Sequence, residues 1–137
     1  LNQADFFDRF SLCQSFTMRN ILIVDDHTDI RRLLCITLGR EFVVREAEDG
    51  RSAMALVAEQ IPDLVLLDVM MPGDMDGLQV LQAIKNSPAT QHVPVGMISA
   101  RGQVVDSDEA RRLGADAYFV KPFSPLQVIT WVRSQFT

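Results

Sequence analysis

From Asn20 onward, short apolar runs alternate with longer segments in which apolar residues recur at helical spacing. The runs lie at residues 21–24, 42–47, 64–67, 93–98 and 117–120. Each is short and bounded by turn formers, which is typical of strands inside a sheet. The segments between and after them carry apolar residues on one helical face. We therefore predict helices that include residues 30–38, 53–57, 78–84, 104–113 and 126–132.

Regular strand–helix alternation predicts a parallel sheet covered by helices on both faces. Because crossovers between parallel strands are right-handed, few topologies remain. We expect an α/β, doubly wound five-stranded sheet with the flavodoxin-like order 2-1-3-4-5. The run at 42–47 is the weakest and is placed at a sheet edge. At 137 residues the chain is long enough for one domain with one sizeable core.

Residues 1–18 differ from the rest of the chain, since they hold half of the eight phenylalanines and no strand pattern. Phe6, Phe10 and Cys13 would share one face of a helix. We interpret residues 1–18 as an N-terminal extension, either an added or linker segment or a short docking helix. We assign it no chemistry, and we place the domain at residues 19–137.

Polar side chains gather where the predicted strands end: Asp25 and Asp26, Asp68, Ser99, and Lys121. In a parallel sheet all these ends lie along one edge. Asp68 alone has two readings, a turn-capping residue or a nucleophilic or metal-binding one. Three carboxylates about 4 Å apart repel by about 4 kcal/mol per pair at an effective dielectric near 20, so either some are protonated or a cation lies among them. All-oxygen ligands suit Mg²⁺.

This set of groups suits phosphoryl transfer. A Mg²⁺ ion and Lys121 would neutralise charge in the transition state while Asp68 accepts the group as an acyl phosphate. The chain after Met18 also resembles the receiver domain of two-component response regulators. The matching pieces are ILIVDD, LVLLDVMMPG followed by DG, VPVGMISA and GADAYFVKPF.

The resemblance implies that Asp68 is the phosphoacceptor and that Asp26 and Asp68 bind Mg²⁺ directly. Asp25 would act through a bound water, and the Met70 backbone carbonyl would be a further ligand. The backbone at Met70 and Ala100 would contact the phosphoryl group. The domain would then catalyse its own phosphorylation without being a conventional enzyme.

The resemblance also implies that Lys121 contacts the phosphoryl group and that the Lys121–Pro122 bond is cis. Ser99 and Tyr118 occupy the family's switch positions, and they would re-pose the face formed by the last two helices and the strand between them. The implied partners are a histidine kinase or phosphotransfer protein, an output domain or downstream protein, and a second copy bound through that face.

Two departures from the family pattern stand out. The loop MPGDMDG has one residue more than the usual MPxMDG, which leaves the loop's shape open but not Asp68. Gly96 interrupts the fourth strand, where it weakens packing or makes room for a neighbour. Met70 and Arg101 flank the site where relatives tune phosphoryl loss. Because the Met70 side chain cannot orient a water, we expect slow self-dephosphorylation.

Other residues receive simpler readings. His27 is interpreted as a helix-start residue rather than a metal ligand, because an all-oxygen site does not need it. The pair Arg31-Arg32 is interpreted as a solvated helix face. A net charge of −5 argues against direct nucleic-acid binding. No apolar stretch approaches a membrane span, and the two cysteines fit a cytoplasmic protein without disulfides.

Rival functions are less consistent with the residues. A phosphohydrolase of the haloacid dehalogenase type needs a second Asp two positions after the nucleophile, where this chain has Met70. An unphosphorylated scaffold would not need the complete set of acidic residues, Ser99 and Lys121. Nucleotide-binding glycine motifs of the G-x-G-x-x-G or G-x-x-x-x-G-K-[ST] type do not occur.

Overall fold

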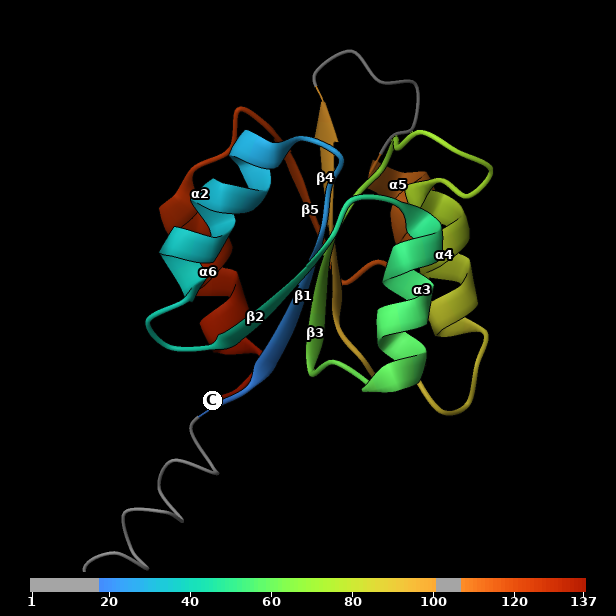
Figure 1. The fold of residues 1–137 in the computed structure, drawn as a ribbon, viewed down its shortest axis with the longest axis horizontal. Coiled ribbons are helices and arrows are strands. Elements are labelled where there is room, and N and C mark those ends of the chain that lie inside the picture. Colours follow the sequence, from blue (N-terminus) through green and yellow to red (C-terminus); the bar gives the residue numbers. More distant parts are fainter. Residues whose placement is uncertain (1–17, 101–106) are drawn as a thin grey trace, which may run out of the picture.

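The computed structural model describes residues 18–100 and 107–137 as five strands that alternate with five helices (Figure 1). The elements, in chain order, are β1 (Asn20–Val24), α2 (Thr28–Leu38), β2 (Val43–Ala47), α3 (Gly50–Glu59), β3 (Leu64–Asp68), α4 (Gly77–Lys85), β4 (Val95–Ala100), α5 (Ser107–Arg112), β5 (Ala117–Lys121) and α6 (Pro125–Ser134). Within these two ranges, no helix has the length and apolar character needed to cross a bilayer.

The five strands form one parallel sheet in the order β2-β1-β3-β4-β5, which confirms the predicted fold class and topology. In Figure 1, α2 and α6 cover one face of the sheet, while α3, α4 and α5 cover the other. The weak strand β2 lies at an edge, as predicted.

Side chains of the central strands alternate between two cores. Ile21 and Ile23 of β1 pack on the α2 and α6 side, whereas Leu22 and Val24 pack on the opposite side. Every residue of β1 and β3 is buried, which explains their continuous apolar runs. The two cores therefore fix both strands from both faces, and with them the residues at their carboxyl ends.

Strand β4 begins at Val95 and not at Val93 as predicted, and it continues through Ser99 and Ala100. The Val93 N–H donates to the Thr90 carbonyl in a turn at 3.0 Å, and Pro94 has no N–H to donate. The predicted helix over 104–113 is described only as α5, since residues 104–106 lie outside the described ranges.

Gly96 makes room for a neighbour, which was one of its two predicted roles. A Cβ atom at this position would lie 2.8 Å from Cζ3 of Trp131 and 3.1 Å from Cδ2 of Leu66. The Trp131 ring from α6 thus lies directly over the β4 backbone and meets the Phe119 ring edge-on, with centroids 5.9 Å apart.

Gly96→Val is therefore expected to lower the free energy of unfolding by about 1–3 kcal/mol, because the added side chain overpacks the site. Urea unfolding followed by far-UV circular dichroism measures the change. In a Trp131→Leu background the same substitution should cost less, since the ring that it meets has been removed. An equal loss in both backgrounds would show that the Trp131 ring is not the cause.

Candidate functional site

The carboxylates predicted to converge are positioned by paired backbone at one edge of the sheet. Val24 pairs with Leu67, so the next residues along the chain, Asp25 just after β1 and Asp68 at the end of β3, lie beside each other. The Asp25 N–H also donates to the Ala47 carbonyl of β2 at 3.1 Å. Asp25 is 0% exposed and Asp68 is 1% exposed, whereas the Asp26 side chain is 30% exposed.

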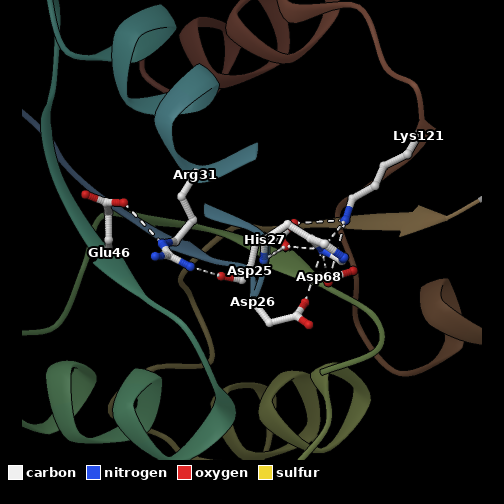
Figure 2. Close-up of polar contacts among 7 residues, drawn as sticks. All are labelled: Asp25, Asp26, His27, Arg31, Glu46, Asp68 and Lys121. Atoms are coloured by element: carbon white, nitrogen blue, oxygen red, sulfur yellow. Dashed lines mark hydrogen bonds and ion pairs between the residues drawn. The ribbon is translucent and has the colours of Figure 1, made fainter. Parts of the chain in front are cut away.

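Lys121 at the end of β5 reaches the same point, as Figure 2 shows. Its Nζ atom lies 3.0 Å from Oδ2 of Asp25 and 3.6 Å from Oδ2 of Asp68. The Lys121–Pro122 peptide bond is cis, as the family resemblance implied. The structure thus brings together three carboxylates and one ammonium group, which leaves an excess of negative charge.

Three carboxylate oxygens in this cluster are buried without a hydrogen bond, namely Oδ1 of Asp26 and both side-chain oxygens of Asp68. Oδ2 of Asp25 is buried against the Lys121 ammonium without a hydrogen bond of its own. Buried anionic oxygens without donors are costly unless a cation meets them. Hard oxygen donors crowded in this way suit a divalent ion such as Mg²⁺. The residues present therefore fit the metal that the sequence implied.

Burial and neighbouring charge change how easily the cluster ionises. The pKa of Asp68 is raised to about 7, chiefly because the carboxyl is buried and next because the Asp25 carboxylate lies beside it. The positive charge of the Lys121 ammonium lowers the pKa of Asp68 and so offsets part of this rise. Without a cation, Asp68 is thus close to half-protonated near neutral pH. A cation among these oxygens would favour the charged, nucleophilic form.

His27 is the N-cap of α2, which confirms its reading as a helix-start residue, but its side chain makes no capping bond. The ring instead lies over the acidic cluster. Its Nδ1 atom is 2.9 Å from Oδ1 of Asp25, and this hydrogen bond is the main reason that the pKa of His27 is raised. Sequence reasoning missed this placement, although the position directly after Asp26 was the available signal.

The interpretation of the Arg31-Arg32 pair as a solvated helix face was wrong for Arg31, whereas Arg32 is exposed as expected. Only 14% of the Arg31 side chain is exposed, and Nη1 donates to the Asp25 backbone carbonyl at 2.7 Å. Its Nε donates to Glu46 of β2 at 3.2 Å, as Figure 2 shows. Arg31 therefore fastens the backbone that presents Asp25. Arg31 follows His27 by one helical turn, and this spacing was the only feature of the sequence that could have placed its side chain near the cluster.

The remaining predicted residues lie around this cluster. Ser99 is 2% exposed, and its hydroxyl donates to the Ala100 carbonyl at 3.1 Å. Tyr118 packs partly buried against the core on the α3 and α4 side. The Met70 side chain, two residues after β3, is 58% exposed. The roles inferred for these residues from the resemblance remain predictions, and Arg101 lies outside the described ranges.

The loop with one extra residue is held at its middle and at its end. Its Asp74 pairs with Arg51 at the start of α3, and Gly73 adopts a φ of +99°, a conformation that favours glycine. The loop ends where Asp76 caps α4 in a reciprocal capping box. A Cβ at Gly77 would lie 1.9 Å from the Asp68 carbonyl, so only glycine allows α4 to begin this close to β3.

Comparisons with known proteins agree with this geometry. The family model described as "Response regulator receiver domain" matches residues 21–133. The chain is similar to the phosphate regulon transcriptional regulatory protein PhoB of Klebsiella pneumoniae, with 40% identity over 85% of this chain and 51% of that protein. It is also similar to the transcriptional regulatory protein ResD of Bacillus subtilis, with 44% identity over 83% of this chain and 46% of that protein.

Among solved structures, the chain is similar to a putative response regulator from Chloroflexus aurantiacus. The TM-score is 0.80 and the identity 29%, over 87% of this chain and 98% of that one. The chain spans about half the length of the two curated relatives, so their whole-protein activities are not carried over to it.

Proposed function

Because the chain belongs to the response regulator receiver domain family, we propose that it is a phosphorylation-controlled signalling switch in which Asp68 accepts a phosphoryl group. One observation carries the proposal. The Asp68 carboxylate is buried and neither of its oxygens has a hydrogen bond. Its Oδ2 atom lies 3.6 Å from Nζ of Lys121, and two further carboxylates lie beside it. The cluster concentrates negative charge that a divalent cation would offset, and the cation and Lys121 would then face the oxygens of a phosphoryl group on Asp68.

In the proposed reaction, an Asp68 oxygen attacks the phosphorus of a partner's phosphohistidine. The new O–P bond forms as the N–P bond breaks, and the electron pair of that bond returns to the imidazole nitrogen. Lys121 transfers its ammonium contact from the carboxylates to a phosphoryl oxygen. When bound, Mg²⁺ would supply positive charge against the phosphoryl oxygens.

The metal would be held by Asp26 and Asp68, by Asp25 through a water, and by the Met70 backbone carbonyl. The backbone at Met70 and Ala100 would contact the phosphoryl group. This division of roles follows the family resemblance. It is supported by the common edge of the sheet at which these residues lie.

The output of the switch is proposed to pass through Ser99 and Tyr118 to the face formed by α5, β5 and α6. A phosphoryl group on Asp68 can shift this face only if it stabilises one of the two conformations of the face more than the other. The proposed partners are a histidine kinase or phosphotransfer protein in the cytoplasm and an output domain or downstream protein, with a second copy as a candidate at this face. We assign no nucleic-acid binding to the domain itself.

The proposal is tested by incubating the protein with acetyl phosphate and Mg²⁺ and measuring its intact mass. We expect an adduct of one phosphoryl group, about 80 Da, that is absent from Asp68→Asn. Asp74→Asn, an exposed change in the following loop, is the matched control and should keep the adduct. An unmodified wild-type protein, or an adduct that persists in Asp68→Asn, would overturn the assignment.

Loss of the phosphoryl group is expected to be slow. The Met70 side chain is exposed beside the site but has no donor or acceptor with which to orient an attacking water. After the phosphorylated protein is separated from acetyl phosphate and kept in Mg²⁺, repeated mass measurements should show that the adduct persists for minutes or longer. A half-life of only seconds would contradict this expectation.

A further inference from the structure

The His27 ring lies among the carboxylates with the spacing of a ligand. Its Nδ1 atom is 2.9 Å from Oδ1 of Asp25, 3.2 Å from Oδ1 of Asp26 and 4.0 Å from Oδ2 of Asp68. One ligand atom from each of these four residues lies within 4.8 Å of all the others. In Figure 2, dashed lines mark the contacts of the ring with the three carboxylates, and the Lys121 ammonium lies nearby.

These separations match an octahedral metal site. Donors about 2.1 Å from an ion are about 3.0 Å apart when adjacent and about 4.2 Å apart when opposite. By this measure, Nδ1 of His27 lies adjacent to the Asp26 oxygen and opposite the Asp68 oxygen, while its 2.9 Å separation from Oδ1 of Asp25 is the hydrogen bond described above. Lys121 Nζ lies 3.5 Å from Nδ1 and 3.6 Å from Oδ2 of Asp68, so the ammonium would have to withdraw as the ion binds between these two atoms. Nδ1 would also have to release the proton that it now donates to Asp25.

A second, independent feature points to a ligand at the same place. The Asp68 side chain is 2% exposed, and neither of its oxygens has a hydrogen-bond donor, although both lie at the cluster that the ring covers. When Asp68 is ionised, the three carboxylates and Lys121 together carry an excess of two negative charges. A divalent ion cancels this excess, and a neutral imidazole ligand leaves the balance unchanged.

We propose that His27 supplies a nitrogen ligand to this cluster, so that the site binds a borderline divalent metal such as Co²⁺, Ni²⁺ or Zn²⁺ through mixed nitrogen and oxygen donors. Imidazole favours these metals, whereas carboxylate, carbonyl and water ligands favour Mg²⁺. The inference rests on the proposed function only in placing a cation among Asp25, Asp26 and Asp68. It makes His27 the residue that determines which cation binds most tightly.

The test measures the affinities of Co²⁺ and Mg²⁺ by titration calorimetry on the tag-free chain. His27→Ala is expected to weaken Co²⁺ at least about tenfold and to change Mg²⁺ affinity by less than about threefold. The Co²⁺ absorption spectrum should also change in this variant, since it loses a nitrogen donor. The chain's other histidine provides the matched control, because His92→Ala removes an exposed imidazole and should change neither affinity.

The His27 side chain makes no capping bond, so His27→Ala should fold, and circular dichroism checks this. Unchanged Co²⁺ affinity in His27→Ala would overturn the proposal. Tighter binding of both metals would also overturn it, by showing that the ring blocks the site. Phosphorylation of the wild type with Mg²⁺ is a separate measurement, so the failure of either hypothesis is recognised without the other.

Discussion

In metal-free buffer at pH 8, Asp68→Asn is expected to raise the free energy of unfolding by about 2–4 kcal/mol. The wild-type carboxylate must be charged at this pH, although it is buried beside Asp25 and both of its oxygens lack donors. An asparagine of the same shape removes the charge, and its amide offers hydrogens to the Asp25 carboxylate. Urea unfolding in the presence of a chelator measures the difference.

The advantage of this variant depends on pH through the raised pKa of Asp68. Burial raises that pKa to about 7 from its ordinary value of 3.8, so the native state holds this proton more tightly than the unfolded chain. The free-energy cost of ionising Asp68 in the native state is therefore absent below about pH 4, grows as the pH rises, and is complete above about pH 7. The difference in free energy of unfolding between Asp68→Asn and the wild type should shrink to near zero at pH 4.

Mg²⁺ far above its Kd should reverse the ranking, because binding to the native state alone stabilises the wild type by about 2.7 kcal/mol at about 100 times Kd and about 4.1 kcal/mol at about 1,000 times Kd. Asp68→Asn lacks one of the proposed carboxylate ligands and should gain little. Asp74→Asn, whose exposed carboxylate pairs with Arg51, should behave like the wild type in both buffers. A variant that is less stable than the wild type in chelator at pH 8 would show that the carboxylates are not repelling each other.

The fold could be predicted from local pattern because the sheet is buried on both faces. Residues 21–24 and 64–67 are continuous apolar runs, and only strands covered on both faces require such runs. The boundary of β4 was the exception. Apolar character continues through Val93 and Pro94, but the hydrogen bonding of Val93 belongs to the preceding turn, which hydrophobicity does not reveal.

The charged cluster could be predicted because a parallel sheet carries all its carboxyl ends to one edge, so Asp25, Asp68 and Lys121 converge without any side-chain detail. The placements of His27 and Arg31 depend instead on where the first turn of α2 lies against β1. As part of a pair of arginines, Arg31 was interpreted as a solvated side chain, yet it donates a hydrogen bond to the Asp25 carbonyl. Such contacts are tertiary, and one sequence contains no signal for them beyond proximity in the chain.

Lys121 occupies a position where its charge has two opposite effects. Its Nζ atom is 3.0 Å from Asp25 and 3.6 Å from Asp68, the residues proposed to gather the cation. The ammonium therefore competes with a divalent ion for the same oxygens. In the proposed reaction, it also neutralises the phosphoryl group as that group reaches Asp68.

Lys121→Met is accordingly expected to bind Mg²⁺ about tenfold more tightly, since a repelling charge is removed from the site, which corresponds to about 1.4 kcal/mol. At saturating Mg²⁺, the same variant should accept the phosphoryl group from acetyl phosphate at least about a hundredfold more slowly, the usual cost of losing one preorganised donor. Calorimetry and timed mass spectrometry measure the two changes.

The opposite directions of these changes separate the proposed role from misfolding, which would weaken metal binding and phosphorylation together. Lys121→Arg keeps the charge and is the matched control, so its Mg²⁺ affinity should stay close to that of the wild type. Its planar guanidinium cannot reproduce the point contact of an ammonium, so phosphorylation should recover only in part. If Lys121→Met accepted the phosphoryl group at the wild-type rate, the Lys121 ammonium would serve only to balance the charge of the carboxylates.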